Sequence, residues 1–248
     1  MIRYSRIIFA YAYCQPCHAL HYLCLYQMKN PVPHIISNDT FWVSPERCLL
    51  WEKENTMIVS DLHLGKTGHF RKEGIAVPQS IYKADLQRLM AQLYLYKVDR
   101  LIIVGDFSHS RGNKELNLFI KWRKDFSMLH IDLVKGNHDI LEDDWYKEAN
   151  IHFHEWDLLV NGFRFRHEDK RIKRAETPGV RYTFTGHVHP GIALKGQGRQ
   201  SLKFPCFYFA KDYCVLPAFS KFTGTYKVKP EKGEIVFAIT EDGLMKIG

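Results

Sequence analysis

The chain has 248 residues and a formal net charge of +8, with 46% hydrophobic and 25% charged residues. This composition is that of a folded globular protein, and it excludes a disordered or low-complexity chain. The positive charge fits a polyanionic partner such as nucleic acid, but a basic surface with no such role explains it equally well. Outside the N-terminus the cysteines are few and scattered, which excludes a disulfide framework and favours a reducing cytoplasm.

The N-terminus is the most unusual part of the chain, because residues 7–26 contain no Asp, Glu, Lys or Arg. A targeting segment or membrane anchor is one interpretation, but Gln15, Pro16 and His18 interrupt the apolar run. We predict that residues 1–27 are a poorly ordered or artefactual extension and that Met28 is the true start. Cys14-Gln-Pro-Cys17-His18 matches a haem attachment pattern, and we attribute the match to chance.

The first half of the chain alternates between short apolar runs and helical periodicity. We predict strands at residues 40–43, 48–51, 57–60, 101–104 and 129–134, with helices at residues 80–97 and 114–126. Such alternation indicates an α/β sheet.

The second half is predicted to contain mainly strands. They are expected at residues 151–154, 157–160, 163–166, 182–185, 191–194, 203–209, 213–216 and 235–239. No internal repeat or linker divides residues 28–248, so we predict one domain. The fold class is α/β (α+β), with a two-sheet β-sandwich flanked by helices.

Polar motifs follow several of these strands. Their carboxylate, imidazole and amide donors, with no cysteine among them, predict a metal centre, with two ions expected. Each block alone is ordinary turn chemistry, so the prediction rests on their occurrence together. The blocks are Asp61-Leu-His63, Gly105-Asp106, Gly136-Asn137-His138-Asp139, His167 and Gly186-His187-Val-His189.

The spacing within the blocks suits metal binding. Asp61 and His63 lie two residues apart, so on an extended strand end their side chains project to the same side. Asp106 follows a glycine that leaves room for ions, and its two oxygens make it the natural bridge between them. Asn137 offers a neutral oxygen.

In these motifs the chain resembles the calcineurin-like metallophosphoesterase superfamily over residues 38–240, which implies a four-layer architecture. The resemblance implies that a first ion binds Asp61, His63, Asp106 and His189. It implies that a second binds Asp106, Asn137, His187 and one further histidine. His167 is the best candidate for that last ligand, with His152 and His154 as rivals.

Shorter motifs are similar to one branch, the bacterial DNA-ligase-associated phosphoesterases, described as DNA-damage-response endonucleases. They are Asp61-Leu-His-Leu-Gly-Lys66, Phe70-Arg71, Gly74-Ile75, Val77-Pro78, Leu216-Pro-Ala-Phe219 and Phe222-Thr-Gly224. Association with a DNA ligase or helicase is implied by this resemblance alone. Gly105-Asp-Phe-Ser-His-Ser110 departs from the protein-phosphatase pattern, because His109 replaces an acid and Ser110 an arginine. A phosphoprotein substrate is therefore less expected.

The implied reaction is phosphodiester hydrolysis by a hydroxide that two metal ions activate, with DNA or nucleotides as the expected substrate in a DNA repair context. Mn²⁺ is the expected ion, with Fe or Zn as alternatives. His138 is the expected general acid and Asp139 the residue that orients it, although His138 could instead merely pack against its neighbours. His109 is a second expected phosphate contact.

Basic residues near the motifs, Lys66 and Arg71 above all, are candidates for substrate binding, with solvated loops as the alternative. Further basic residues follow the later motifs: Lys170, Arg171, Lys173, Arg174, Lys195, Arg199 and Lys203. Phe219 and Phe222 could stack on a base, but core packing is our default. Two rival functions stay open. One is a phosphomonoesterase or small-molecule phosphodiesterase, and the other is a non-catalytic repair scaffold.

Overall fold

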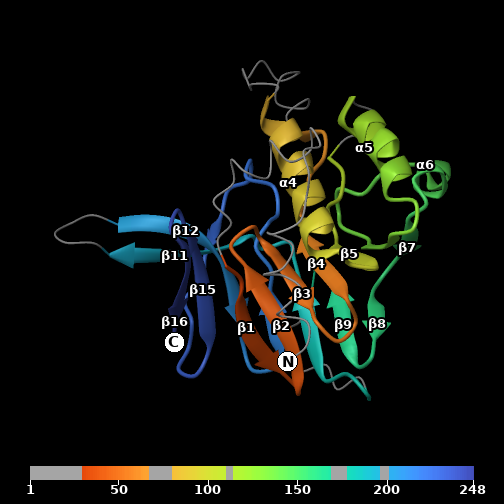
Figure 1. Cartoon of the computed structure of the whole chain (residues 1–248). Coiled ribbons are helices and arrows are strands. Elements are labelled where there is room, and N and C mark those ends of the chain that lie inside the picture. The colour runs from red at the N-terminus through yellow and green to blue at the C-terminus, as the bar shows by residue number, and fades with distance from the viewer. Residues whose placement is uncertain (1–29, 67–79, 110–113, 169–177, 196–200) are drawn as a thin grey trace, which may run out of the picture.

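The computed structural model describes residues 30–66, 80–109, 114–168, 178–195 and 201–248 (Figure 1). The predicted N-terminal extension, residues 1–27, lies outside the described residues, as does the Cys14–His18 motif. Among the described residues, no helix is both long enough and apolar enough to cross a membrane.

The first sheet has seven strands whose spatial order is their chain order. The strands are β1 (Val32–Ile36), β2 (Asp39–Ser44), β3 (Cys48–Trp51), β4 (Thr56–Ser60), β5 (Arg100–Val104), β6 (His130–Val134) and β7 (His152–His154). Strands β1 to β4 are antiparallel, whereas β4 to β7 run parallel. Parallel neighbours need long crossover connections, and these carry α4 (Ser80–Tyr96), α5 (Lys114–Asp125) and α6 (Asp143–Glu148).

The second sheet has nine strands and is mixed. At its centre β10 (Tyr182–Thr185) runs parallel to both β9 (Phe163–Arg166) and β13 (Tyr213–Val215). The other strands are β8 (Leu158–Val160), β11 (Pro190–Lys195), β12 (Ser201–Phe209), β14 (Tyr226–Lys227), β15 (Ile235–Thr240) and β16 (Gly243–Ile247). Strands β11 and β12 extend away from the body of the molecule as a two-stranded ribbon (Figure 1).

The first sheet is buried on both faces, which explains why its central strands are mostly apolar. On β5, Leu101 and Ile103 pack with residues of the helices, whereas Ile102 and Val104 pack with the second sheet. An aromatic layer fills the space between the sheets, where Phe41, Phe163 and Phe184 contact one another.

The predicted fold class, a two-sheet sandwich with flanking helices, is confirmed. All three described helices gather on the outer side of the first sheet. Parallel β4, β5 and β6 of the first sheet and β9 and β10 of the second each end in one of the polar motifs. The sandwich therefore brings motifs from both sheets to one end of the molecule.

Candidate metal centre

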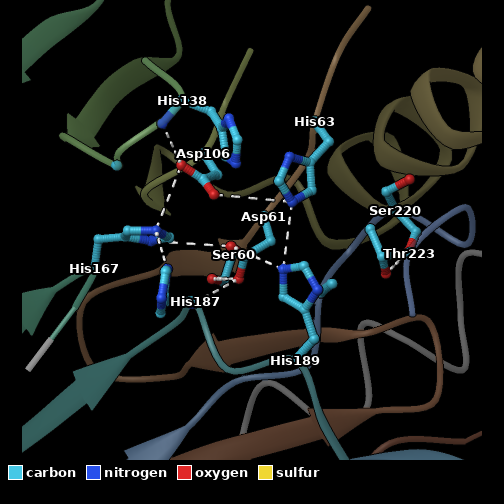
Figure 2. A network of polar contacts seen from close by, with 12 residues as sticks. Ser60, Asp61, His63, Asp106, His138, His167, His187, His189, Ser220 and Thr223 are labelled. Atoms are coloured by element: carbon cyan, nitrogen blue, oxygen red, sulfur yellow. Dashed lines mark hydrogen bonds and ion pairs between the residues drawn. The ribbon is translucent and has the colours of Figure 1, made fainter. Parts of the chain in front are cut away.

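Two clusters of candidate ligands form at these strand ends. In each cluster, one ligand atom from each of three side chains lies within 4.8 Å of the others. The first group is Asp61, His63 and His189, and the second group is Asp106, His167 and His187. Each group joins residues from both sheets, and Figure 2 shows the side chains converging on a common space.

Asp106 belongs to the second group and also faces the first. Its Oδ2 is 3.9 Å from Nε2 of His63, and its Oδ1 is 3.4 Å from Nε2 of His167. Asn137 joins the second group, because its Oδ1 is 3.2 Å from Nε2 of His167 and 3.1 Å from Nδ1 of His187. The structure thus brings together the side chains that the family resemblance implied as ligands.

Five of the candidate ligands have left-handed backbone conformations, which residues other than glycine rarely adopt. The φ angles are 55° at Asp61, 48° at His63, 46° at Asp106, 65° at His187 and 49° at His189. Such conformations cost on the order of 1–3 kcal/mol each and persist only where the surroundings enforce them. Backbone strain is thus concentrated at this centre.

At two motif positions only glycine fits, because neighbouring side chains lie too close for a Cβ atom. A Cβ atom at Gly186 would lie 2.0 Å from Oγ of Ser60 and 2.8 Å from Oδ2 of Asp61. At Gly105, a Cβ atom would lie 2.0 Å from Nδ1 of His167. A side chain at either position would therefore displace residues of the centre.

The pKa of a buried histidine is shifted in opposite directions in the two groups. Burial lowers the pKa of His63 to about 3 despite the nearby charges of Asp61 and Asp106, so its imidazole is neutral at physiological pH. Burial also lowers the pKa of His167, but the hydrogen bond to Asp106 and the charge of Asp61 outweigh it and raise the pKa to about 9. Burial raises the pKa of Asp106, yet its bond with His167 and the N–H of His138 hold the pKa well below its usual range.

The donor set fits metal ions. Oδ1 of Asp61 is buried and accepts no hydrogen bond. Nε2 of His189 lies 3.3 Å from it, and Nδ1 of His167 lies 3.9 Å from it. Nε2 of His63 faces Nε2 of His189 at 3.3 Å, and Nδ1 of His187 faces Nε2 of His167 at the same distance. Opposed imidazole nitrogens beside carboxylates are the arrangement that a divalent cation satisfies.

The predicted general acid, His138, lies beside this cluster. Its ring centroid is 5.6 Å from that of His63 and 4.4 Å from that of His109. Its backbone N–H donates to Oδ1 of Asp106 over 2.9 Å (Figure 2). Asp106 therefore helps to hold the backbone of His138 in position.

Asp139 was predicted to orient His138, and among the described residues its hydrogen bonds are with backbone N–H groups of other residues. Its carboxylate is buried and accepts backbone N–H groups from Ser108 over 3.0 Å and Gly136 over 2.9 Å. Burial raises the pKa of Asp139 to about 7 against these two bonds. In this structure Asp139 joins the loop after β5 to the loop after β6.

The other predicted residues have mixed placements. Lys66 is half-buried, and Asp106 and Asp61 are among the charges that act on it. Arg71, Lys170, Arg171, Lys173, Arg174 and Arg199 lie outside the described residues, and the side chain of Lys195 is not described. Phe219 is fully buried under the guanidinium of Arg88, which confirms packing as its role.

The rival ligands lie elsewhere. Nε2 of His154 is 2.7 Å from Oδ1 of Asp132, and the ring of His152 packs against that of His130. His167, by contrast, belongs to the second group.

Two residues of the site were missed by the sequence analysis. Ser60, immediately before Asp61, has a hydroxyl in contact with Oδ2 of Asp61 and 2.9 Å from the carbonyl oxygen of Val104. Glu168 places Oε1 3.8 Å from Nε2 of His187. The adjacency of Ser60 to a ligand was an available signal, whereas Glu168 had none beyond its position after His167.

The chain is similar to a known family in sequence and to known proteins in structure. The model of the family "Calcineurin-like phosphoesterase" matches residues 55–173. Among solved structures, Pseudomonas putida nuclease MPE is 26% identical with a TM-score of 0.73, and the match covers 88% of this chain and 100% of that one. YfcE, a phosphoesterase from E. coli, is 14% identical with a TM-score of 0.40, covering 77% and 97% of the two chains.

Comparison with curated proteins returned no match. The family match begins one residue before β4 and contains the first three motif blocks and His167, and the P. putida nuclease shares the fold over its whole length. Residues 55–173 form a calcineurin-like phosphoesterase domain, and the protein is a metal-dependent phosphoester hydrolase.

Proposed function

We propose that the protein hydrolyses phosphodiester bonds with two metal ions and that its substrate is DNA or a nucleotide in a DNA repair context. The observation that carries the proposal is the position of Asp106, whose two oxygens face two separate ligand groups. A carboxylate shared by neighbouring ions is the usual bridge of two-metal hydrolases.

Asp61, His63, Asp106 and His189 would hold one ion, and Asp106, Asn137, His167 and His187 the other, with Mn²⁺ expected and Fe or Zn as alternatives. Such ions supply Lewis-acid stabilisation of the phosphate and a hydroxide near neutral pH. The protein itself fixes where each ion can bind, because strained backbone at the ligands sets the direction of each side chain.

His138 is assigned the role of general acid. Its imidazole lies beside the first group, half-buried, and its backbone is tied to Asp106. A ring N–H there can donate a proton to the leaving alkoxide oxygen. His109, whose ring centroid is 4.4 Å from that of His138, would contact the phosphate or the leaving group.

A polyanionic substrate is supported by three observations. The chain carries a formal charge of +8, Lys66 is half-buried near the acidic ligands, and the P. putida protein with this fold is a nuclease. Arg71 and association with a DNA ligase or helicase remain part of the proposal. So does a cytoplasmic location, which the free, buried thiols of Cys48, Cys206 and Cys214 favour.

The test is Mn²⁺-dependent hydrolysis of bis-p-nitrophenyl phosphate against p-nitrophenyl phosphate. We expect faster turnover of the diester, loss of activity in Asp106→Ala, and a kcat about 10²–10⁴-fold lower in His138→Ala with metal binding retained. His152→Ala is the matched control, because that histidine is exposed and packs only against His130 among the ring contacts of described residues.

Three other outcomes would change the proposal. Preference for the monoester would favour a phosphomonoesterase on the same scaffold. Activity with Fe or Zn in place of Mn²⁺ would correct the metal. No turnover with any of these ions would leave a repair scaffold that retains the fold.

A further inference from the structure

One segment, residues 218–228, follows the first ligand group along its length, and we call it the clamp segment. Its backbone N–H groups bond to both sides of that group. Phe219 donates to the carbonyl oxygen of Ser60 over 2.7 Å, and Ser220 donates to that of Asp61 over 3.2 Å. Further along, Tyr226 donates to the carbonyl oxygen of His189 over 2.8 Å. One segment thus holds the backbone of two ligands that lie far apart in the sequence.

A buried ion pair on α4 holds the clamp segment in turn. Asp85 and Arg88 are both buried, and Nη2 of Arg88 donates to Oδ1 of Asp85 over 2.9 Å. The guanidinium also donates to the carbonyl oxygen of Phe219 and lies 4.1 Å from the centroid of that ring. Asp85 accepts the hydroxyl of Ser220 over 2.9 Å and the backbone N–H of Lys221 over 3.1 Å.

A second arginine binds the same stretch from the turn between β2 and β3. Nη1 of Arg47 donates to the carbonyl oxygens of Ala218 over 3.1 Å and Ser220 over 2.7 Å. Charged side chains therefore satisfy the carbonyl groups at 218, 219 and 220 in succession. Figure 2 places Ser220 and Thr223 beside His63 and His189, across the centre from His167 and His187.

The second group has its own backbone support. The carbonyl oxygen of His167 accepts the Thr185 hydroxyl over 2.8 Å and the Gly186 N–H over 3.1 Å. Asp106 is tied to the N–H of His138. These bonds come from the strand ends themselves and do not involve α4.

We propose that Asp85 and Arg88 are positioning residues that set the affinity of the first ion site alone, by holding the clamp segment against Asp61 and His189. Both ligands have strained, left-handed backbone, which relaxes when its surroundings loosen. Side chains that orient metal ligands typically contribute about 10- to 100-fold in metal affinity. This inference rests on the two-ion centre of the proposed function.

The test is Mn²⁺ binding by titration calorimetry, together with the EPR signal that distinguishes a coupled ion pair from an isolated ion. The variants are Arg88→Lys, which keeps the charge and loses the guanidinium geometry, and Asp85→Asn, which keeps the shape and loses the charge. We expect one of two sites to weaken about 10- to 100-fold and the coupled signal to give way to an isolated one.

Two further variants, each with one ion site removed, show which site is weakened. With His187→Ala, binding reports the first group, and Arg88→Lys should weaken it. With His63→Ala, binding reports the second group, and Arg88→Lys should leave it unchanged. Arg123→Lys is the matched control, because Arg123 is also buried and bonds to the carbonyl oxygens of Ala149 and Leu129, on the helix side of the first sheet.

Several outcomes decide the matter. If folded Arg88→Lys binds two ions with wild-type affinity, or if both sites weaken equally, the inference is wrong. If Arg88→Lys does not fold, Ser220→Ala replaces it. That change removes the hydroxyl that Ser220 donates to Asp85 and that accepts the N–H of Phe222 within the clamp segment, and the same selective loss is expected. A wild-type protein that binds fewer than two ions would overturn the proposed centre instead, and this result is distinct from the others.

Discussion

His63 and His189 face one another through their Nε2 atoms at 3.3 Å, although they are 126 residues apart in the chain. Both have left-handed backbone, and each lies near a carboxylate oxygen: Oδ2 of Asp106 is 3.9 Å from Nε2 of His63, and Oδ1 of Asp61 is 3.3 Å from Nε2 of His189. Two imidazole nitrogens can share one proton, or each can direct a lone pair at a cation. The surrounding carboxylates make the cation the better partner, and the geometry of both histidines is best explained by that role.

The close approach at Gly186 gives a direct prediction. Gly186→Ala would place a methyl group on Oγ of Ser60, so Ser60 and Asp61 must move. We expect a loss of stability of about 1–3 kcal/mol and loss of metal binding, measured by thermal unfolding with and without Mn²⁺. Gly224→Ala is the control, because a Cβ atom there meets nothing within 4 Å. Similar behaviour of the two variants would show that the centre tolerates displacement of Asp61.

His167 and His154 were rivals for the second site, and substitution separates them. His167→Ala should remove one ion of two, because its Nε2 lies among the second group. His154→Ala should keep both ions and lose only the contact with Asp132. Metal content after dialysis, measured by atomic emission, checks both. The assignment fails if His154→Ala is the variant that loses an ion.

Asp139 is expected to stabilise the fold by accepting the backbone N–H groups of Ser108 and Gly136. An amide in its place can accept only one of the two N–H groups from Ser108 and Gly136, since its own NH₂ would face the other. We expect Asp139→Asn to lose about 1–3 kcal/mol of unfolding free energy. The limbs of its pH–rate profile should not shift, whereas a role in charging His138 would move the limb that reports the general acid. The exposed Asp143→Asn is the control.

Asp132 should contribute to stability in a pH-dependent way. Burial raises its pKa, but hydrogen bonds from His154 and Arg100 outweigh burial and lower the pKa below the usual value. A carboxylate with a lowered folded-state pKa stabilises fully above its unfolded pKa of about 3.9, and this stabilisation is lost as pH falls through the folded-state pKa. Asp132→Asn should therefore be destabilised by about 1–3 kcal/mol near neutral pH, and by progressively less below about pH 4.

Urea unfolding of both proteins between pH 3 and pH 7 measures this difference. Asp144→Asn is the comparison, because Asp144 pairs with Lys147 on the surface and its loss should have little effect. A difference that stays constant with pH would show that the Asp132 carboxylate contributes no charge-dependent stability.

Much of the fold could be predicted from the sequence because the central strands are unambiguous. The runs that became β4, β5 and β6 are short and mostly apolar, and they alternate with helical periodicity, so only an α/β sheet accommodates them. Strand β1 was missed because Val32-Pro-His-Ile-Ile36 contains a proline and lies at the sheet edge. Helix α6 was missed because six residues are too few to show a period.

The candidate ligands could be predicted for a different reason. They follow parallel strands directly, so chain order alone brings them to one edge. The sequence motifs alone did not divide the ligands into two groups or select His167 over His154. The family resemblance suggested both, and the contacts in the structure show where each histidine lies. The support from Asp85 and Arg88 could not be read from the sequence, because Arg88 donates to a carbonyl group and Asp85 accepts a hydroxyl that are more than 130 positions away.

The most direct test of the account is anomalous X-ray diffraction from crystals of the protein soaked in Mn²⁺. We predict two peaks, one among Asp61, His63 and His189 and one among Asn137, His167 and His187, with Asp106 in contact with both. A single peak, or peaks away from these residues, would contradict the two-metal centre.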